Sequence, residues 1–408
     1  MDSSAQSLDS LWAFRDSLYR CFERRADALF ELTDALLSAG PVPSPPHLSL
    51  AAIHRRGWGS RYAALSLGRA HKAGLQELLC RHPLEGAEPG CPPIYAVDVS
   101  VWPRCDAEAS PGRGYYYHPS RHSAGQPIVA GWAYQLVAQL GFERDSWVAP
   151  VDARGLKPTE DTDEVAVEQA RVLIGGLPGS ALEPIFVFDA GYDPVKLQRG
   201  LEGSPARILV RLHSNRVFFY APPEEVEPRP VGRPPRHGEK FDLKDPSSWP
   251  EPAGEHRCES EDYGEVRVRA WSELHPKSRR IAERYGCERA PVVRGTVILV
   301  EVGKLPRQTR KPKKHCGCGG ALRAMRISIC SGRHTAAGST SNPHHTVPEA
   351  NPQLDHSPVQ APRAGRPLDL AGLGRLHAAE AVAVHRRRPE AAVGAIATAP
   401  AADPDPRP

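Results

Sequence analysis

Two aspartates stand in short apolar segments of the kind that form buried strands. Asp98 lies near the end of IYAVDV (94–99), and Asp189 ends IFVFD (185–189). In open α/β sheets, ligands gather at the carboxyl ends of strands. A carboxylate that loses water there needs compensation, and a divalent cation held between two such groups supplies it. We therefore expect Asp98 and Asp189 to be metal ligands. The alternative for Asp189 is a cap on the following helix.

Strand-type and helix-type segments alternate around these two aspartates, which predicts an α/β domain with a mixed sheet. Residues 221–254 are rich in Pro and charge, so we expect a loop or an insertion there, and the Pro-rich and β-containing insertion extends over about 221–290. The predicted strands are 94–99, 114–118, 128–140, 148–151, 184–189, 207–220, 266–271 and 292–302, and the predicted helices are 163–174 and 193–201.

The first 87 residues have a different pattern. Apolar residues recur at three- and four-residue steps over 10–37, which predicts an amphipathic helix or a pair of helices, and a second helical stretch covers about 48–79. We expect a small helical N-terminal domain over 1–87. Its basic string includes Arg55 and Arg56, which could contact DNA phosphates or form a solvated helix face.

Composition limits the class of protein. The 408 residues contain 52 Lys and Arg against 48 Asp and Glu, so the net charge of +4 is too small to indicate nucleic-acid binding by itself. No apolar stretch approaches the ~20 residues of a membrane span, and the N-terminus lacks the pattern of a signal peptide. Nine Cys without a repeating spacing read as reduced thiols. We expect a cytoplasmic protein without a membrane partner.

Four segments resemble the DDE-type transposases of bacterial insertion sequences. They are YAVDVSVWPRCDAE (95–108), GYYYHPSRHSAGQPIVAGWAYQLVAQLG (114–141), FDAGYD (188–193) and VGRPPRHGEKF (231–241), and the resemblance covers about 1–314. It implies a ribonuclease H-like DDE catalytic core over 91–314, in which Asp98 and Asp189 are the first two catalytic acids. It also implies a two-metal site for Mg²⁺ or Mn²⁺, double-stranded DNA at the element ends as partner, a homodimer as a candidate assembly, and a location with the nucleoid.

Several basic residues are candidates for DNA contact. VGRPPRHG (231–238) resembles the Gly-Arg-Pro core of minor-groove hooks, in which Arg reads a narrow A·T groove. A solvated Pro-rich linker is the alternative. Arg267 and Arg269 could line a DNA groove or form the exposed face of a strand. The candidate contacts of the linker are Arg229, Arg233 and Arg236, and those of the basic segment before the tail are Arg310, Lys311, Lys313 and Lys314.

The resemblance ends near Lys314. The family continues with a Trp-rich strand and a helix that carries the third acidic residue, whereas this chain continues with HCGCGGALRAMRISICSGRH, in which we see no clear strand. Every aromatic residue lies at or before Tyr285, and no Lys follows Lys314. Codons chosen for this tail can encode family-like segments in other reading frames. We therefore interpret 315–408 as a low-complexity, disordered tail that a frameshift has produced.

The expected function follows from this resemblance. It implies metal-dependent cleavage and transfer of DNA strands in transposition, a form of DNA recombination. Two-metal phosphoryl transfer needs a third carboxylate to complete the site. We expect this chain to be inactive because that residue is missing. The alternative is a catalytically inert DNA-binding remnant that could inhibit transposition.

Overall fold

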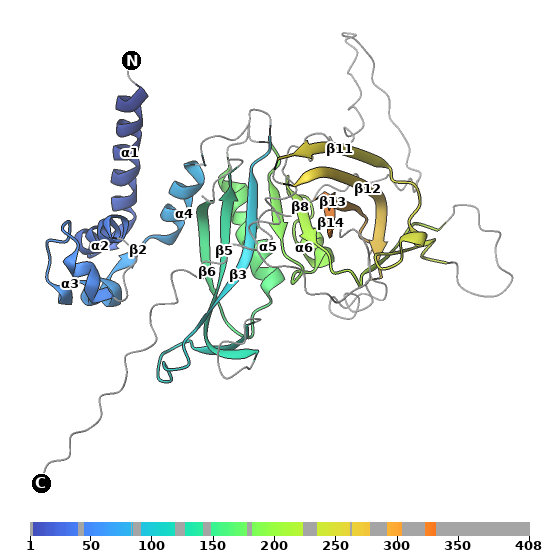
Figure 1. Cartoon of the computed structure of the whole chain (residues 1–408). Helices are drawn as coiled ribbons and strands as arrows, with labels where there is room; N and C mark the ends of the chain where they lie inside the picture. The colour runs from blue at the N-terminus through green and yellow to red at the C-terminus, as the bar shows by residue number, and fades with distance from the viewer. Residues whose placement is uncertain are drawn as a thin grey trace, which may run out of the picture. The chain divides into compact units, whose positions relative to one another are not determined.

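The computed structural model of the chain divides into two compact units, which are described separately (Figure 1). The first contains the described residues up to Glu160 together with Val172–Leu182. The second contains Asp161–Arg171 and the described residues from Glu183 onward. The residues that the structure describes are 3–39, 45–82, 84, 91–118, 127–141, 148–177, 182–222, 235–261, 263–277, 292–303 and 323–331.

The first unit begins with helices, as the periodicity predicts. The first helical segment is a pair of helices, because Phe22–Arg24 leaves the helix to pair antiparallel with Arg69–Ala70. Arg25 then takes a left-handed conformation, with φ 56°, before the second helix starts. The elements are α1 (Ser3–Arg20), β1 (Phe22–Arg24), α2 (Ala26–Ser38), η1 (Pro45–Leu50), α3 (Trp58–Leu67), β2 (Arg69–Ala70) and α4 (Lys72–Arg81).

Side chains join these helices into one body. The Arg15 guanidinium of α1 donates two hydrogen bonds to the Asp34 carboxylate of α2, at 2.7 and 2.9 Å. Leu32, Ala35 and Leu48 form a small buried cluster between α2 and η1. No helix among the described residues is long and apolar enough to span a membrane.

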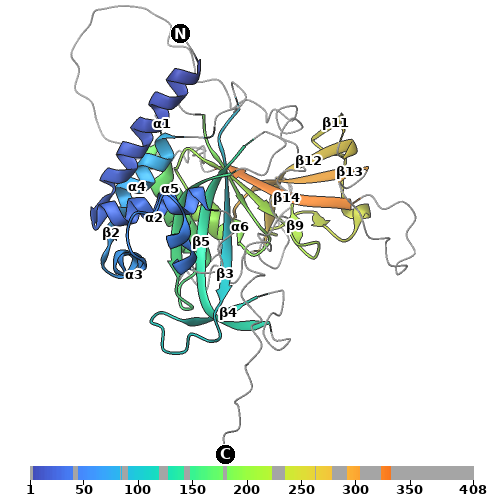
Figure 2. The ribbon, with the colours of Figure 1, turned by 60° about the vertical axis from the view of Figure 1, so that its left-hand side comes forward.

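An antiparallel sheet follows in the same unit (Figure 2). Its central strand β5 pairs with β3 along one edge, and with β4 and β6 along the other. Residues of β5 alternate between buried and more exposed positions, so one face is packed and the other is open. The strands are β3 (Ile94–Pro103), β4 (Gly114–Tyr117), β5 (Ile128–Leu140) and β6 (Val148–Leu156).

The second unit carries a mixed sheet. Strands β7 and β8 run parallel, with α6 as the crossover between them, and the remaining pairings are antiparallel. The strand order is β10-β9-β12-β13-β14-β8-β7, with β11 beside β12. The elements are α5 (Thr162–Gly176, whose first part belongs to this unit), β7 (Ile185–Phe188), α6 (Pro194–Gly200), β8 (Arg207–Arg211), β9 (Val217–Phe219), β10 (Lys240–Asp242), η2 (Pro246–Ser248), β11 (Gly254–Ser260), β12 (Gly264–Pro276), β13 (Gly295–Val302) and β14 (Arg323–Ser331).

The expected α/β class with a mixed sheet is confirmed, but two predictions about its strands are wrong. The segment 207–220 forms two strands, β8 and β9, because the chain turns between them. The segment 221–254, predicted as a loop or an insertion, contains the short strand β10. The segment after Lys314, in which we expected no clear strand, contains β14, which pairs with β13 on one side and β8 on the other. The other residues from 304 to the C-terminus lie outside the described residues.

Candidate functional site

Asp98 lies on the open face of β3. Its side chain is exposed, its partner across the strand pair is Leu136 of β5, and its Oδ1 accepts the Val99 N–H at 2.8 Å. The strand continues to Pro103, so Asp98 occupies the middle of β3 rather than its end. The prediction of a strand-end position is therefore wrong for Asp98, because the strand extends past the apolar run into Ser100 and Trp102.

Asp189 follows the last residue of β7 directly, as predicted. It is half-buried, and its Oδ1 accepts the Gly191 N–H at 2.8 Å, which closes a turn of the Asx type. The alternative role as a helix cap is wrong, because Asp193 caps α6 by accepting the Val195 N–H at 2.9 Å. The short loop from Asp189 to Asp193 therefore has a defined conformation at both ends.

Buried side chains also fix the conformation of this loop. The Tyr192 ring is 4% exposed and lies 5.1 Å from the Phe188 ring, centroid to centroid. The Asp163 carboxylate in the first turn of α5 is buried and accepts the Asp193 N–H at 2.8 Å. Helix α5 and the loop that carries Asp189 are thus tied together within the second unit.

Lys196 of α6 completes this network. Its ammonium donates to Asp161 at 2.8 Å and to Asp163 at 2.9 Å. Burial by itself lowers the pKa of Lys196, but its bonds to the two carboxylates outweigh burial and raise that pKa above its ordinary value. Burial also raises the pKa of the Asp163 carboxyl, against the lowering effect of the Asp193 N–H and of Lys196. We call Asp161, Asp163, Asp193 and Lys196 the loop anchor.

The sequence analysis missed the loop anchor, although one signal was present. Asp161 caps α5, with its Oδ1 accepting the Asp163 N–H at 2.9 Å and the Glu164 N–H at 3.4 Å. An acidic cap followed three residues later by Glu is typical of a helix N-terminus. Nothing local in the sequence indicates that Lys196 approaches this turn.

The donor chemistry of the two candidate ligands fits a hard divalent cation. Asp98 and Asp189 offer carboxylate oxygens, the ligands that Mg²⁺ and Mn²⁺ prefer. Each carboxylate is oriented by a backbone N–H on Oδ1. Asp98 belongs to the first unit and Asp189 to the second. The described part of the chain contains no group of three or more His, Cys, Asp or Glu side chains placed to share one metal ion.

The basic string of the N-terminal helices is largely bound by acids. Glu31 of α2 accepts the N–H groups of Arg55 and Arg56 and also the Arg56 Nε–H, the last at 2.8 Å. The Arg56 guanidinium also lies 3.5 Å from Asp27. Burial raises the pKa of Glu31, but these bonds outweigh it and the pKa lies below its ordinary value. The Arg55 side chain is exposed and remains a candidate for phosphate contact.

Arg236 is the one candidate of the Arg-Pro segment among the described residues, and it is exposed beside two histidines. His237 Nδ1 and His275 Nε2 are 2.8 Å apart, and the two rings stack. Burial lowers the pKa of His275 to about 4, with smaller contributions from His237, Arg294 and Arg236. The other predicted DNA contacts, Arg229, Arg233, Arg310, Lys311, Lys313 and Lys314, lie outside the described residues.

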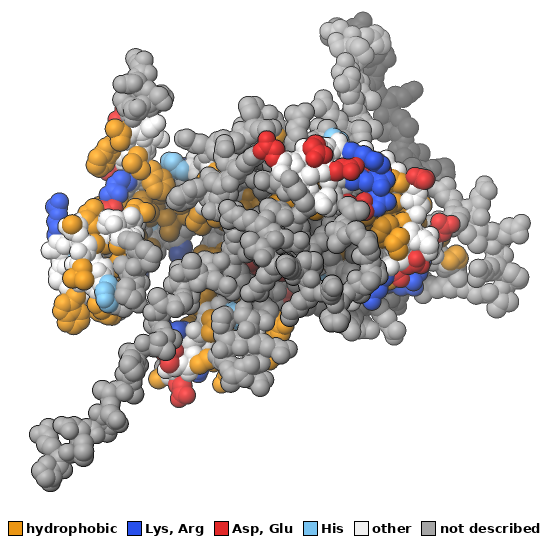
Figure 3. Space-filling model, viewed as in Figure 1, with side chains coloured by type: hydrophobic (Ala, Val, Ile, Leu, Met, Phe, Trp, Pro, Cys, Tyr) orange, Lys and Arg blue, Asp and Glu red, His pale blue; other side chains and the backbone are white. Residues whose placement is uncertain are grey.

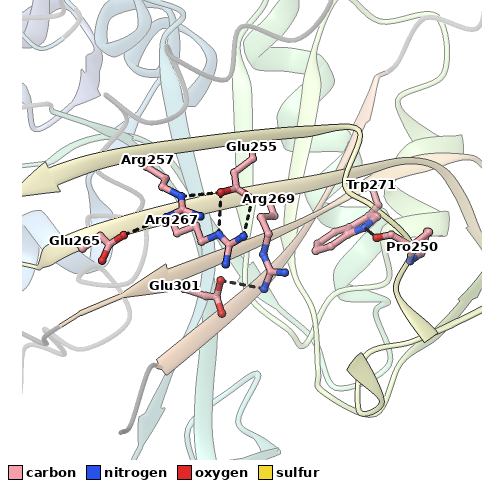
Figure 4. Close-up of polar contacts among 8 residues, drawn as sticks. All are labelled: Pro250, Glu255, Arg257, Glu265, Arg267, Arg269, Trp271 and Glu301. Atoms are coloured by element: carbon pink, nitrogen blue, oxygen red, sulfur yellow. Dashed lines mark hydrogen bonds and ion pairs between the residues drawn. The ribbon is translucent and has the colours of Figure 1, made fainter. Parts of the chain in front are cut away.

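Arginines on β11 and β12 form an ion-pair network (Figure 4). Arg267 donates two hydrogen bonds to Glu255, at 2.8 and 3.0 Å, and Arg257 donates to the same carboxylate at 2.7 Å. These bonds, the one from Arg267 first, lower the pKa of Glu255 to about 2. Arg269 donates to Glu301 at 3.0 Å. In Figure 3, Lys and Arg side chains accordingly gather beside acidic side chains over this region. The network favours a structural role for Arg267 and Arg269 over contact with a DNA groove.

Comparison with known proteins identifies a family. A family model described as DDE superfamily endonuclease matches residues 17–277, more than half of the chain, and this range includes both Asp98 and Asp189. No curated protein sequence matches the chain significantly.

Proposed function

The chain belongs to the DDE superfamily of endonucleases, and from this premise we propose that it is the transposase of an insertion sequence. In this proposal it binds double-stranded DNA at the ends of the element, with Asp98 and Asp189 as ligands of Mg²⁺ or Mn²⁺. The observation that carries the proposal is the fixed position of Asp189 at the end of β7, held by the Gly191 N–H and by the loop anchor. A location with the nucleoid, and action as a homodimer, belong to the same proposal.

The chain's own residues would act as follows. Asp98, on an open sheet face, and Asp189, in a rigid loop, would each present a carboxylate oxygen to the cation. The bound cations would supply electrostatic stabilisation of the attacking and leaving oxygens in phosphodiester cleavage. Arg55 and Arg236 would bind phosphates, because both side chains are exposed. Phosphate contacts position a protein on DNA but do not read its sequence.

We further propose that this chain binds DNA without cutting it. The resemblance to the family ends near Lys314, before the position where the third acidic residue is expected, and a frameshift there would account for the change. With two carboxylates, the chain would bind the cation weakly and leave the second metal position incomplete. This reading favours an inhibitory remnant, which would occupy the ends of the element and exclude an intact transposase.

A gel shift and a cleavage assay on the same labelled terminal-repeat DNA test these proposals together. We expect a shift that weakens with salt, as phosphate contacts require, and no cleavage in Mg²⁺ or Mn²⁺. Absence of any shift would overturn DNA binding. Cleavage that disappears in Asp98→Ala would overturn the inactivity and show that the third carboxylate is supplied after all.

Metal binding has its own test, which does not depend on cleavage of DNA. Fe²⁺ bound in place of Mg²⁺ generates hydroxyl radicals with peroxide and ascorbate, and these cut the polypeptide close to the metal. We expect cuts next to Asp98 and Asp189 that are lost in Asp98→Asn and in Asp189→Asn. Asp106→Asn is a matched control, since Asp106 is exposed and paired with Arg104. Cuts elsewhere, or cuts unchanged in both variants, contradict the assignment.

A further inference from the structure

An exposed aromatic surface covers the open face of the sheet in the first unit. Trp102 of β3 is 60% exposed, and Tyr115 and Tyr117 of β4 are 71% and 66% exposed. Tyr134 of β5 is 37% exposed, and its ring lies 5.7 Å from the Trp102 ring in an edge-to-face arrangement. Large aromatic side chains on a strand are normally buried against a second layer. We call these four side chains the aromatic face.

Strand register places the aromatic face on the same side of the sheet as Asp98. In an antiparallel pair, residues directly opposite each other project to one face, as do alternate residues along a strand. Asp98 lies opposite Leu136, and Ser100 lies opposite Tyr134. Tyr115 lies opposite Ala130, an even-numbered residue of β5 like Tyr134 and Leu136. Asp98, Trp102, Tyr134 and Tyr115 therefore share one face.

The opposite face of the sheet is packed. Gln135 and Val137 of β5 are 0% and 1% exposed, and Val97 of β3 is 2% exposed. The aromatic side chains therefore do not belong to the buried core of the sheet. They form the outer surface of a sheet whose inner face is already covered.

The separation between Asp98 and Trp102 suits a nucleic-acid strand. Four residues along a strand correspond to about 13 Å, at ~3.3 Å per residue. Stacked nucleotides advance ~3.4 Å each, so this distance corresponds to about four nucleotides. A DNA strand that ran along β3 with one phosphate at Asp98 would place its neighbouring bases over Trp102 and Tyr134.

We propose that the aromatic face binds unpaired bases of the DNA strand that reaches Asp98. This inference rests on the proposed function, and it adds a site that accepts single-stranded rather than double-stranded DNA. Aromatic rings stack on bases of any sequence, because every base has a π-face, whereas paired bases inside a duplex offer only their edges. Of the residues that strand register places on this face, Asp98 alone is acidic, so little negative charge opposes the phosphates.

The test is fluorescence anisotropy of a labelled single-stranded oligothymidylate, titrated with the full chain in EDTA so that no cleavage can occur. A duplex with the same label is measured in parallel. We expect the double variant Trp102→Ala with Tyr134→Ala to weaken single-strand binding about tenfold or more and to leave duplex binding unchanged. Trp102→Phe keeps a ring and should bind the single strand within about threefold of the unmodified chain. Trp12→Ala is the matched control, because Trp12 is 64% exposed on α1.

Three results would overturn the inference: unchanged single-strand binding in the double variant, equal losses for duplex and single strand, or the same loss in Trp12→Ala. If the unmodified chain sediments as a dimer and the double variant as a monomer, the aromatic face binds a second copy of the chain. That result would also overturn the inference. If the double variant does not fold, Trp102→Phe beside Trp102→Ala decides. Failure of the proposed function is separate, since it appears as absent duplex binding or as absent metal-dependent cuts at Asp98.

Discussion

The buried carboxylate of Asp163 accepts the backbone N–H of Asp193 at 2.8 Å, and this bond ties the first turn of α5 to the loop that carries Asp189. A candidate metal ligand on a loop needs support from groups that are themselves fixed. Asp163 meets this requirement because it is buried and bound to Lys196, while Asp193 is fixed as the cap of α6. The position of Asp189 therefore depends on residues that need not touch metal or DNA.

Removing the cation of the loop anchor should destabilise the second unit. Lys196→Met removes the ammonium that donates to both Asp161 and Asp163, and the largely buried Asp163 carboxylate loses its ion pair with Lys196. We expect the free energy of unfolding to fall by about 2–3 kcal/mol, since breaking a buried pair leaves an uncompensated charge. Urea denaturation measures the change. Lys72→Met, at an exposed position on α4, should change stability by less than about 0.5 kcal/mol. Equal effects of the two variants would contradict the role of the anchor.

A methyl group at Gly191 should disturb Asp189 with little effect on the fold. A Cβ at Gly191 would lie 3.0 Å from Asp189 Oδ1, so the carboxylate must shift by a few tenths of an ångström. We expect Gly191→Ala to weaken Mn²⁺ binding about tenfold, the range seen when groups that orient ligands are changed. Titration followed by Mn²⁺ paramagnetic resonance measures the affinity. In Gly175→Ala, where a Cβ meets nothing within 4 Å, the affinity should not change.

The histidine pair should make stability depend on pH in the acid range. The pKa of His275 is lowered to about 4 from an ordinary value of 6.5. Below pH 6.5 the His275 ring therefore binds a proton in the unfolded chain but not in the folded chain. The stability contributed by the neutral ring is present above pH 6.5 and is lost as the pH falls towards 4. We expect a loss of about 1–2 kcal/mol by about pH 5, with allowance for solvent screening.

His275→Gln removes this titration while keeping a polar group near His237 Nδ1. The unfolding free energy of that variant should therefore fall less steeply between pH 6.5 and pH 4. Arg236, Arg294 and Lys277 are the charged groups that contribute to the lowered pKa values of the pair. His213→Gln, at an exposed position, should leave the pH dependence as it is in the unmodified chain. An unaltered slope in His275→Gln would rule out His275 as its source.

Glu31 should hold the N-terminal helices together above its pKa. Glu31→Gln weakens the bonds to the Arg55 and Arg56 N–H groups and removes the ion pair with the Arg56 guanidinium. We expect a loss of about 1–2 kcal/mol at neutral pH. Since the folded pKa of Glu31 lies below the ordinary 4.5, its contribution is present above pH 4.5 and disappears as the pH falls further. Thermal unfolding of the two proteins should therefore converge in acid; a constant difference would contradict the charge as its origin.

Much of the fold could be predicted because it depends on local patterns. The apolar periodicity over 10–37 indicated one helix or a pair, which the structure shows as α1 and α2, and the strand predicted over 128–140 is β5 with its observed bounds. The apolar run before Asp189 likewise indicated β7. Segment 323–331 also contains a local signal, since Met325, Ile327 and Ile329 alternate with other residues as in a strand. We missed β14 because the composition of the whole tail dominated the interpretation.

The sequence by itself determined many of the strands and helices and which acidic side chains stand beside apolar runs, because these depend on neighbours within a few residues. Tertiary structure decided the rest. Lys196 meets Asp163 across 33 residues, and His275 meets His237 across 38. The insertion of β14 between β13 and β8, and the common face of Asp98 and Trp102 with Tyr134, depend on strand order and register. Register is set by packing across strands distant in sequence, and a shift of one residue would turn each side chain to the other face.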